Sequence, residues 1–173
     1  MGTSKYKELQ NAVEVLRGSV KDPTINLDFS VNSVKHIDYI LDVAFSNGKL
    51  KNPNGAFAEH LGLMMLGMSG YLTEVIIRNT NNTKVDINEG DENWYTSFNL
   101  IAENGWTARP AQRVMKRAYE GKVAELLAYT LSTIKYFNSP LSDSPPIEGR
   151  YVEEVYVRDD QKQKDGKPWW KFW

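Results

Sequence analysis

Two charged residues in the central apolar segment have a spacing that allows chemistry. Glu74 and Arg78 are four positions apart in a segment predicted to be helical, so both side chains lie on one face. Facing a cavity, the carboxylate and the guanidinium would hold a small polar ligand, with Trp94 from the following segment as an apolar wall. The simpler alternative is an ion pair along the helix, since the acidic residue precedes the basic one. Glu74, Arg78 and Trp94 are therefore the candidate site of a small-molecule enzyme or sensor.

A second candidate site is basic. Arg113, Lys116 and Arg117 recur at helical spacing, with Arg109 four positions before the first of them. On one exposed face they would bind a phosphate-bearing partner through charge-assisted hydrogen bonds. The alternative is a solvated face that keeps the protein soluble. Aromatic residues do not alternate with these charges, which argues against a binding site for single-stranded nucleic acid.

The third candidate is an aromatic cluster in the last residues of the sequence. Three of the five tryptophans lie there, and the cluster consists of Trp169, Trp170, Phe172 and Trp173. Exposed aromatic surface of this size promotes aggregation and usually marks a contact. Three contacts are open: with a groove on the same domain, with a partner protein or second copy, or with a membrane interface. We expect a protein partner or self-association, rather than a membrane.

The composition excludes several classes of site. The 173 residues include no cysteine, so disulfides, thiol catalysis and thiolate metal sites are excluded. The two histidines, His36 and His60, are too few for a three-histidine metal site. Phosphate-binding loops and the common hydrolase and metalloprotease motifs are also missing. The net charge of −1 provides no general attraction to nucleic acid. We expect no metal and no cofactor.

The hydrophobic pattern defines the elements that must position these residues. Apolar residues recur every three or four positions in segments 4–17, 30–46, 55–79, 110–120 and 123–137, which predicts five helices. Period-two alternation predicts an extended segment at 25–29, a hairpin of 85–87 with 94–100, and a short strand at 106–108. The glycines of the third helix, Gly55, Gly62, Gly67 and Gly70, suggest close packing against a neighbour. The class is α+β: a helix-rich single domain with a small antiparallel hairpin or sheet and an extended C-terminal tail.

The composition changes after Asn138. Residues 1–138 are predicted to form the helix-rich domain, and 139–173 a Pro/Ser-rich linker, a strand-like run at 151–157 and the aromatic tail. Within the domain, the longest uninterrupted apolar run, Leu61–Leu72, is too short to span about 30 Å of hydrocarbon. The polar N-terminal residues do not resemble a signal peptide. We therefore expect a buried central helix in a cytoplasmic protein.

Part of the sequence resembles small bacterial proteins of unknown function. These have a glycine-containing helix of the form G-x-L-G-E-x-I-R-R-N, then a tryptophan hairpin and a helix that begins with proline. The resemblance covers about residues 55–137, with Thr73 and Ile77 replacing a glycine and an arginine of that pattern. It implies a bacterial cytoplasmic domain and no particular activity. If Glu74 and Arg78 are the recurrent polar pair of such proteins, they would bridge the central helix to the hairpin.

These observations lead to one functional hypothesis and one alternative. With no catalytic motif and an aromatic tail, the chain is predicted to be a non-enzymatic protein-binding or accessory module, of immunity type, that uses the tail. The alternative is the enzyme or sensor with a pocket between the central helix and the hairpin.

Overall fold

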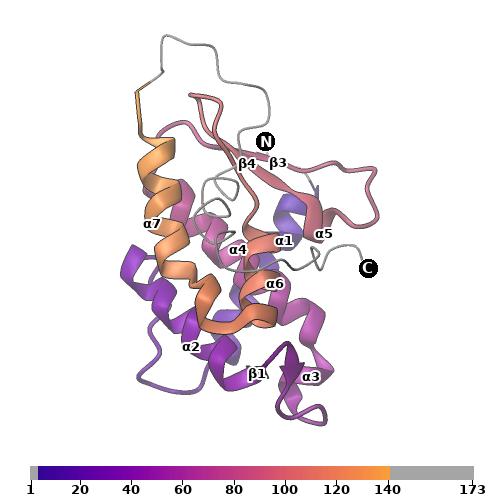
Figure 1. Cartoon of the computed structure of the whole chain (residues 1–173). Helices are drawn as coiled ribbons and strands as arrows, with labels where there is room; N and C mark the ends of the chain where they lie inside the picture. The colour runs from indigo at the N-terminus through magenta and orange to yellow at the C-terminus, as the bar shows by residue number, and fades with distance from the viewer. Residues whose placement is uncertain (1–3, 141–173) are drawn as a thin grey trace, which may run out of the picture.

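The computed structural model describes residues 4–140 of the chain. Its fold is α+β with far more helix than strand, as the sequence predicts (Figure 1). The α-helices are α1 (Ser4–Ser19), α2 (Val34–Ala44), α3 (Ala56–Glu59), α4 (Leu61–Arg78), α5 (Trp94–Ser97), α6 (Pro110–Glu120) and α7 (Leu126–Phe137). The strands are β1 (Phe45–Ser46), β2 (Lys49–Leu50), β3 (Lys84–Asp86), β4 (Asn99–Ile101) and β5 (Thr107–Ala108). The predicted strand-like run 151–157 and the aromatic cluster lie outside the described residues, and the division at residue 138 stays a prediction.

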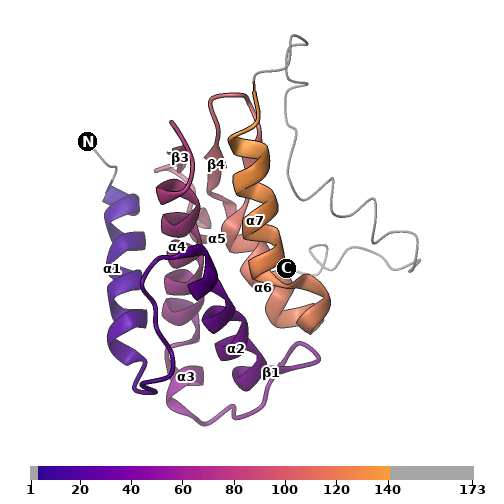
Figure 2. The same ribbon diagram turned by 90° about the vertical axis from the view of Figure 1, so that its left-hand side faces the viewer.

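Two glycines let α1 lie against the central helix α4, and Figure 2 shows these helices side by side. A Cβ atom on Gly67 would lie 2.6 Å from the carbonyl oxygen of Ala12. A Cβ on Gly70 would lie 2.6 Å from Cγ2 of Val13. Both distances are shorter than non-bonded atoms tolerate, so the close approach requires glycine at these positions. Gly62 has no such neighbour within 4 Å, so the expectation of tight packing holds for only part of the series.

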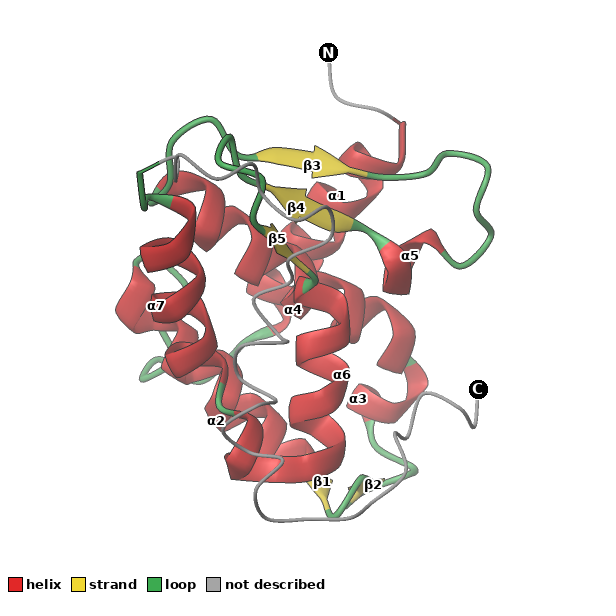
Figure 3. Cartoon of the chain, turned by 45° about the horizontal axis from the view of Figure 1, so that its top comes forward, coloured by secondary structure: helices red, strands yellow, loops and turns green. Residues whose placement is uncertain are grey.

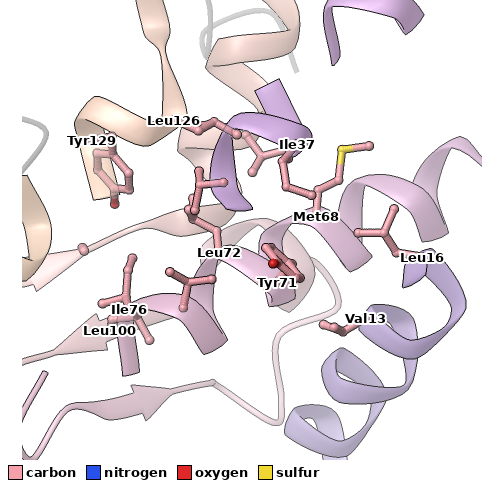
Figure 4. Close-up of a cluster of buried hydrophobic side chains, with 14 of the residues drawn as sticks. Val13, Leu16, Ile37, Met68, Tyr71, Leu72, Ile76, Leu100, Leu126 and Tyr129 are labelled. Carbon is pink, nitrogen blue, oxygen red and sulfur yellow. The ribbon is translucent and has the colours of Figure 1, made fainter. Parts of the chain in front are cut away.

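The main core lies where α4 meets α2, α7 and the sheet. Figure 4 shows side chains from all of these elements meeting around α4, and those labelled are Val13, Leu16, Ile37, Met68, Tyr71, Leu72, Ile76, Leu100, Leu126 and Tyr129. All of them are buried. Because each large apolar side chain contributes about 1.5–3 kcal/mol on burial, this cluster is the main stabilising feature of the domain.

A three-stranded antiparallel sheet, in the order β3-β4-β5, covers one end of the helices (Figure 3). Val85 pairs with Leu100, and Leu100 also pairs with Ala108. The predicted hairpin is therefore present, with a third strand at the predicted position. The turn after β4 carries Asn104, whose side-chain amide donates to the carbonyls of Tyr136 and Ser139 at 2.8 and 2.9 Å. These bonds join the sheet to the end of α7.

The prediction that Trp94 belongs to a strand is wrong, because Trp94–Ser97 form the short helix α5. The carboxylate of Asp91 accepts hydrogen bonds from the Asn93 amide and from the Ser97 hydroxyl, at 2.8 and 2.5 Å. Both bonds favour a turn over an extended chain. Only the last part of the predicted strand, β4, pairs with β3.

The extended segment predicted at 25–29 is a loop that pairs with no strand in the described part of the chain. Its alternating apolar residues pack instead on helices. Phe29 has a positive φ of 63° and stacks on the ring of Tyr71 with centroids 4.9 Å apart. The Tyr71 hydroxyl accepts a hydrogen bond from the Phe29 amide at 2.9 Å. The packing of this loop against α4 replaces a strand ladder.

A small hairpin of β1 and β2 lies at the end of the helices opposite the three-stranded sheet (Figure 3). Its two turn residues, Asn47 and Gly48, have φ angles of 50° and 74°. Two positive φ angles are the signature of the tight hairpin turn that Asn-Gly favours. Gly48 also sits against Tyr119 of α6: a Cβ there would lie 2.6 Å from the ring. The helix predicted over residues 30–46 ends earlier, at Ala44, and this hairpin was not predicted from the sequence.

Candidate functional site

The structure confirms the ion pair between Glu74 and Arg78 on α4. Arg78 Nε lies 3.6 Å from Glu74 Oε2. The other carboxylate oxygen, Oε1, accepts hydrogen bonds from the Tyr6 hydroxyl at 2.8 Å and from the Gln10 amide at 3.4 Å. Partial burial and the neighbouring carboxylate raise the pKa of Tyr6 to about 12. The pair therefore joins α4 to α1, whereas the resemblance implied a bridge to the hairpin.

The Arg78 guanidinium also lies over an aromatic ring. Its Cζ is 3.9 Å from the ring centroid of Phe29, and Arg17 approaches the same ring at 4.8 Å. Such cation–π contacts stabilise the fold by about 0.5–1 kcal/mol at exposed sites. The guanidinium of Arg78 therefore has two partners within the protein, the carboxylate of Glu74 and the ring of Phe29.

Trp94, the third residue of this candidate site, is 8% exposed. It packs with Leu9, Phe98 and Ala111 in a second apolar cluster. The Lys5 ammonium lies 5.8 Å from its ring centroid and donates to the carbonyl of Asp91 at 2.8 Å. These contacts place Trp94 in the packing of α5 against α1 and α6. The predicted pocket requires Glu74, Arg78 and Trp94 to converge on a ligand, and the described contacts use each of them within the fold.

The basic residues of α6 do not form the exposed stripe that the sequence suggested. Arg117 is 2% exposed, and its Nε donates to Asp38 Oδ1 at 2.7 Å. Its Nη2 donates to Asp42 Oδ1, also at 2.7 Å. Burial alone would lower the pKa of Arg117, but the hydrogen bonds to Asp42 and Asp38 outweigh it and raise that pKa above its ordinary value. Arg117 is therefore charged and fully engaged with α2.

The other two predicted anion-binding residues, Arg113 and Lys116, also make contacts within the protein. Arg113 is 2% exposed, with its Cζ 5.2 Å from the ring centroid of Tyr129 on α7. Lys116 Nζ lies 3.7 Å from Glu120 Oε2, one helical turn away. The sequence predicted an exposed face, whereas α6 packs this face against α2 and α7. The prediction of an exposed basic face at Arg113, Lys116 and Arg117 is wrong for both arginines.

A hollow in the surface lies elsewhere, in an apolar groove of about 290 Å³ between α4, α5, α6 and the β1–β2 hairpin. We call it the α4–α6 groove; it is lined by Phe45, Gly48, Leu61, Gly62, Met65, Leu66, Ser69, Tyr95, Thr96, Ala111, Met115, Ala118 and Tyr119. Two exposed tyrosines, Tyr95 and Tyr119, are among these residues. None of Glu74, Arg78 and Trp94 is a lining residue of this groove.

The α4–α6 groove is suited to hold an apolar group. Its lining contains no Asp, Glu, His, Lys or Arg among the described residues, so it offers no carboxylate or imidazole for acid–base catalysis. Leu61–Leu66, the first residues of α4, are only partly covered, whereas the buried residues of this helix all lie from Gly67 onward. An apolar helix that is exposed along one part marks an interaction surface.

The sequence contained a signal for two features that were not predicted from it, the carboxylates beside Arg117 and the α4–α6 groove. Asp38 and Asp42 are four positions apart, beside the apolar residues Ile37 and Leu41, so their carboxylates border the buried face of α2. For the groove, the run Leu61–Leu66 is apolar all round, which is more than one core-facing stripe needs. That excess was interpreted as burial on most sides.

Two further findings concern membranes and metals. α4 is long and apolar enough to span a membrane, but 50% of this span is buried inside the fold, as in the core helix of a soluble protein. Among residues 4–140, no group of three His, Asp or Glu side chains is placed to hold a metal ion.

The comparisons with known proteins add no family. No protein-family model, curated protein or solved structure matches the chain. The resemblance to small bacterial proteins of unknown function therefore stays a prediction, and the functional argument depends on the geometry.

Proposed function

We propose that this protein is a non-enzymatic protein-binding module, an accessory or immunity-type protein of the bacterial cytoplasm, that contacts its partner through the aromatic cluster Trp169, Trp170, Phe172 and Trp173. Aromatic side chains are the usual anchors of such contacts, because each buries a large apolar area at a small cost in conformational entropy. The partner that fits this cluster is a protein with an apolar pocket on its surface.

The observation that carries the proposal is how the described domain uses its own aromatic residues. Trp94 is packed in the second apolar cluster, and Trp106 stacks on Tyr136 with centroids 4.7 Å apart. The main core is formed by residues between Val13 and Phe137. The sequence adds four aromatic residues in its last five positions, and a cluster of this kind is typical of the anchors by which one protein contacts another.

The polar candidates support binding over catalysis. Glu74, Arg78 and Arg117 are engaged in ion pairs inside the domain. The α4–α6 groove, in turn, has an apolar lining without a charged residue. Exposed apolar surface of this kind is a common feature of sites that bind another protein.

The test is quantitative affinity capture from a lysate of the source organism, with the full chain and a chain that ends at Lys167 as baits. The full chain is expected to capture a stoichiometric partner that the shortened chain loses, while both show the same far-UV circular dichroism and unfold in one cooperative transition. The purified partner should then bind the full chain directly, with a loss of at least about tenfold in affinity when Trp169, Trp170, Phe172 and Trp173 are all replaced by alanine.

The matched control replaces four polar residues of the same segment, Asp159, Asp160, Gln161 and Gln163, with alanine and should leave the affinity unchanged. A partner that binds the shortened chain equally well would contradict the proposal. A shortened chain that unfolds would also contradict it, because the aromatic cluster would then belong to the core.

A further inference from the structure

The α4–α6 groove and the aromatic cluster have matching chemistry. We propose that residues Pro168–Trp173 of the same chain occupy this groove when no partner is bound, so that the partner must compete with the groove for the aromatic side chains. This inference goes beyond the proposed function, since it adds regulation, and its competition step rests on that function.

The lining of the groove suits an aromatic side chain. Met65 and Met115 contribute thioethers, which pack favourably against aromatic rings and adapt to their shape. Tyr95 and Tyr119, which are 46% and 55% exposed, offer ring surface at the groove. The volume of about 290 Å³ lies at the lower end of the range for ligand sites, about 300–1,000 Å³, and therefore fits side-chain anchors better than a cofactor.

One face of the groove is open enough to admit a bulky group. A Cβ atom on Gly62 would meet no atom of the described residues within 4 Å, in contrast to Gly67 and Gly70, which pack against α1. A glycine inside a helix lowers stability by about 1 kcal/mol relative to alanine. At Gly67 and Gly70 the contact with α1 explains that cost, and at Gly62 the described residues offer no such contact. A segment that binds over Gly62 would explain why a glycine is present at this position of the helix.

The chain is long enough for its own end to be that occupant. The sequence has 27 residues between Pro140 and Pro168, and at up to ~3.3 Å per residue they reach ~90 Å. A compact domain of about 137 residues has a radius of gyration of only ~14 Å. Every point on its surface, including the α4–α6 groove, is therefore within reach of Trp169–Trp173.

Mass action favours the same chain over a second copy. A segment tethered by a linker of this length has an effective concentration near the groove of about a millimolar. A second copy in a micromolar solution is about a thousandfold more dilute. With an intrinsic dissociation constant near 0.1 mM, docked chains would thus outnumber undocked chains about tenfold. The same contact between two chains would hardly form.

The test uses the full chain with ¹³C-methyl methionine. Of the five methionines, Met65 and Met115 line the groove and Met68 is fully buried in the core. A variant with alanine at 169, 170, 172 and 173 removes the aromatic rings from the cluster. The methyl signals of Met65 and Met115 are expected to shift between the full chain and this variant, because ring currents act only on nearby nuclei. The Met68 signal should stay in place, which also shows that the fold is intact.

A groove variant makes the test specific. Gly62→Leu fills the groove without adding an aromatic ring, and in this background the alanine substitutions should no longer shift Met65 and Met115. Gly18→Leu is the matched control, since Gly18 is another helical glycine with open space around it that does not line the groove. In the Gly18→Leu background the shifts should remain.

Three results would overturn the inference. They are unchanged Met65 and Met115 signals, shifts that survive in the Gly62→Leu background, and shifts that vanish on tenfold dilution. The last result would assign the occupant to a second copy. All these measurements use purified protein without a partner, so their failure leaves the proposed function standing. If the segment docks in the groove, Gly62→Leu should increase capture of the partner. The absence of any partner would contradict the proposed function and leave the docking in the groove unaffected.

Discussion

The carboxylate of Asp38 on α2 accepts a hydrogen bond from Arg117 Nε on α6 at 2.7 Å. It also accepts hydrogen bonds from the first backbone amides of α7. Its Oδ1 lies 3.0 Å from the Leu126 amide nitrogen, and its Oδ2 lies 3.2 Å from that of Leu127. A negative charge at the start of a helix satisfies amides that have no partner within the helix and interacts favourably with its dipole. One carboxylate thus connects α2 to residues of α6 and α7 that lie 79 to 89 positions later in the sequence.

The first prediction concerns Arg117, which is buried between Asp38 and Asp42. Arg117→Ala leaves the Asp38 carboxylate buried without its cation, so the free energy of unfolding should fall by about 3–5 kcal/mol. Equilibrium urea denaturation measures the loss. The neighbouring Lys116→Ala is the control: its pair with Glu120 is partly exposed, so the loss should not exceed about 1 kcal/mol. Equal losses for the two variants would contradict a structural role for the Arg117 network.

The second prediction concerns pH and Tyr6. The pKa of Tyr6 is raised to about 12 by partial burial and then by its hydrogen bond to Glu74, whereas the phenol of an unfolded chain titrates near 10. A raised pKa means that the folded state favours the neutral phenol. This contribution to stability is complete below pH 10 and is lost as the pH rises from about 10 to 12.

The measurement for Tyr6 is the urea midpoint at pH 9, 10 and 11. The difference between the wild-type protein and Tyr6→Phe should shrink over this range, because phenylalanine cannot ionise. Tyr39→Phe removes a hydroxyl from an exposed tyrosine and is the control variant. A difference for Tyr6→Phe that does not change with pH would show that folding does not raise the pKa of Tyr6.

The longer helices of residues 4–140, namely α1, α2, α4, α6 and α7, could be predicted from the sequence because each has its own apolar periodicity, whereas the single helix predicted at 55–79 is divided at His60 into α3 and α4. α6 is an example: it begins at Pro110, and it ends at Gly121, whose φ of 71° suits glycine. Trp94 is a case in which the sequence pattern predicted the wrong secondary structure. Alternation in 94–100 fitted a strand, but the hydrogen bonds of Asp91 and the burial of the indole against Leu9 favour a helical turn. Tertiary contacts of this kind have no local signature.

The candidate site was less predictable than the fold, for a related reason. Spacing places Arg113 and Arg117 on one face of α6 but does not show what covers that face, and two aspartates 75 and 79 positions away cover Arg117. The spacing of Glu74 and Arg78 predicted their ion pair correctly because both partners lie on one helix. The α4–α6 groove is made by four separate elements and therefore depends on the tertiary fold.

The third prediction concerns Asn104, which joins the sheet to the end of α7. Its side-chain amide donates to the carbonyls of Tyr136, Phe137 and Ser139, which lie at and just beyond the C-terminal end of α7. Asn104→Ala should lower the free energy of unfolding by about 1–3 kcal/mol, measured by urea denaturation. Asn138→Ala removes an exposed bond to Asn79 and should change stability by no more than about 0.5 kcal/mol. A loss for Asn104→Ala as small as that of Asn138→Ala would show that the turn does not hold α7.

The fourth prediction compares glycines of α4 that differ only in what surrounds them. Gly67→Ala places a methyl group 2.6 Å from the Ala12 carbonyl oxygen, so α1 must move, and the free energy of unfolding should fall by about 1–3 kcal/mol. In the chain that ends at Lys167, a Cβ at position 62 meets no atom of residues 4–140 within 4 Å, and Gly62→Ala removes a residue that disfavours helix, so stability should rise by up to about 1 kcal/mol. The same substitution thus has opposite signs five positions apart in one helix. Thermal and urea denaturation of both variants measure this difference, and a gain for Gly67→Ala would mean that α1 does not pack on α4 as closely as described.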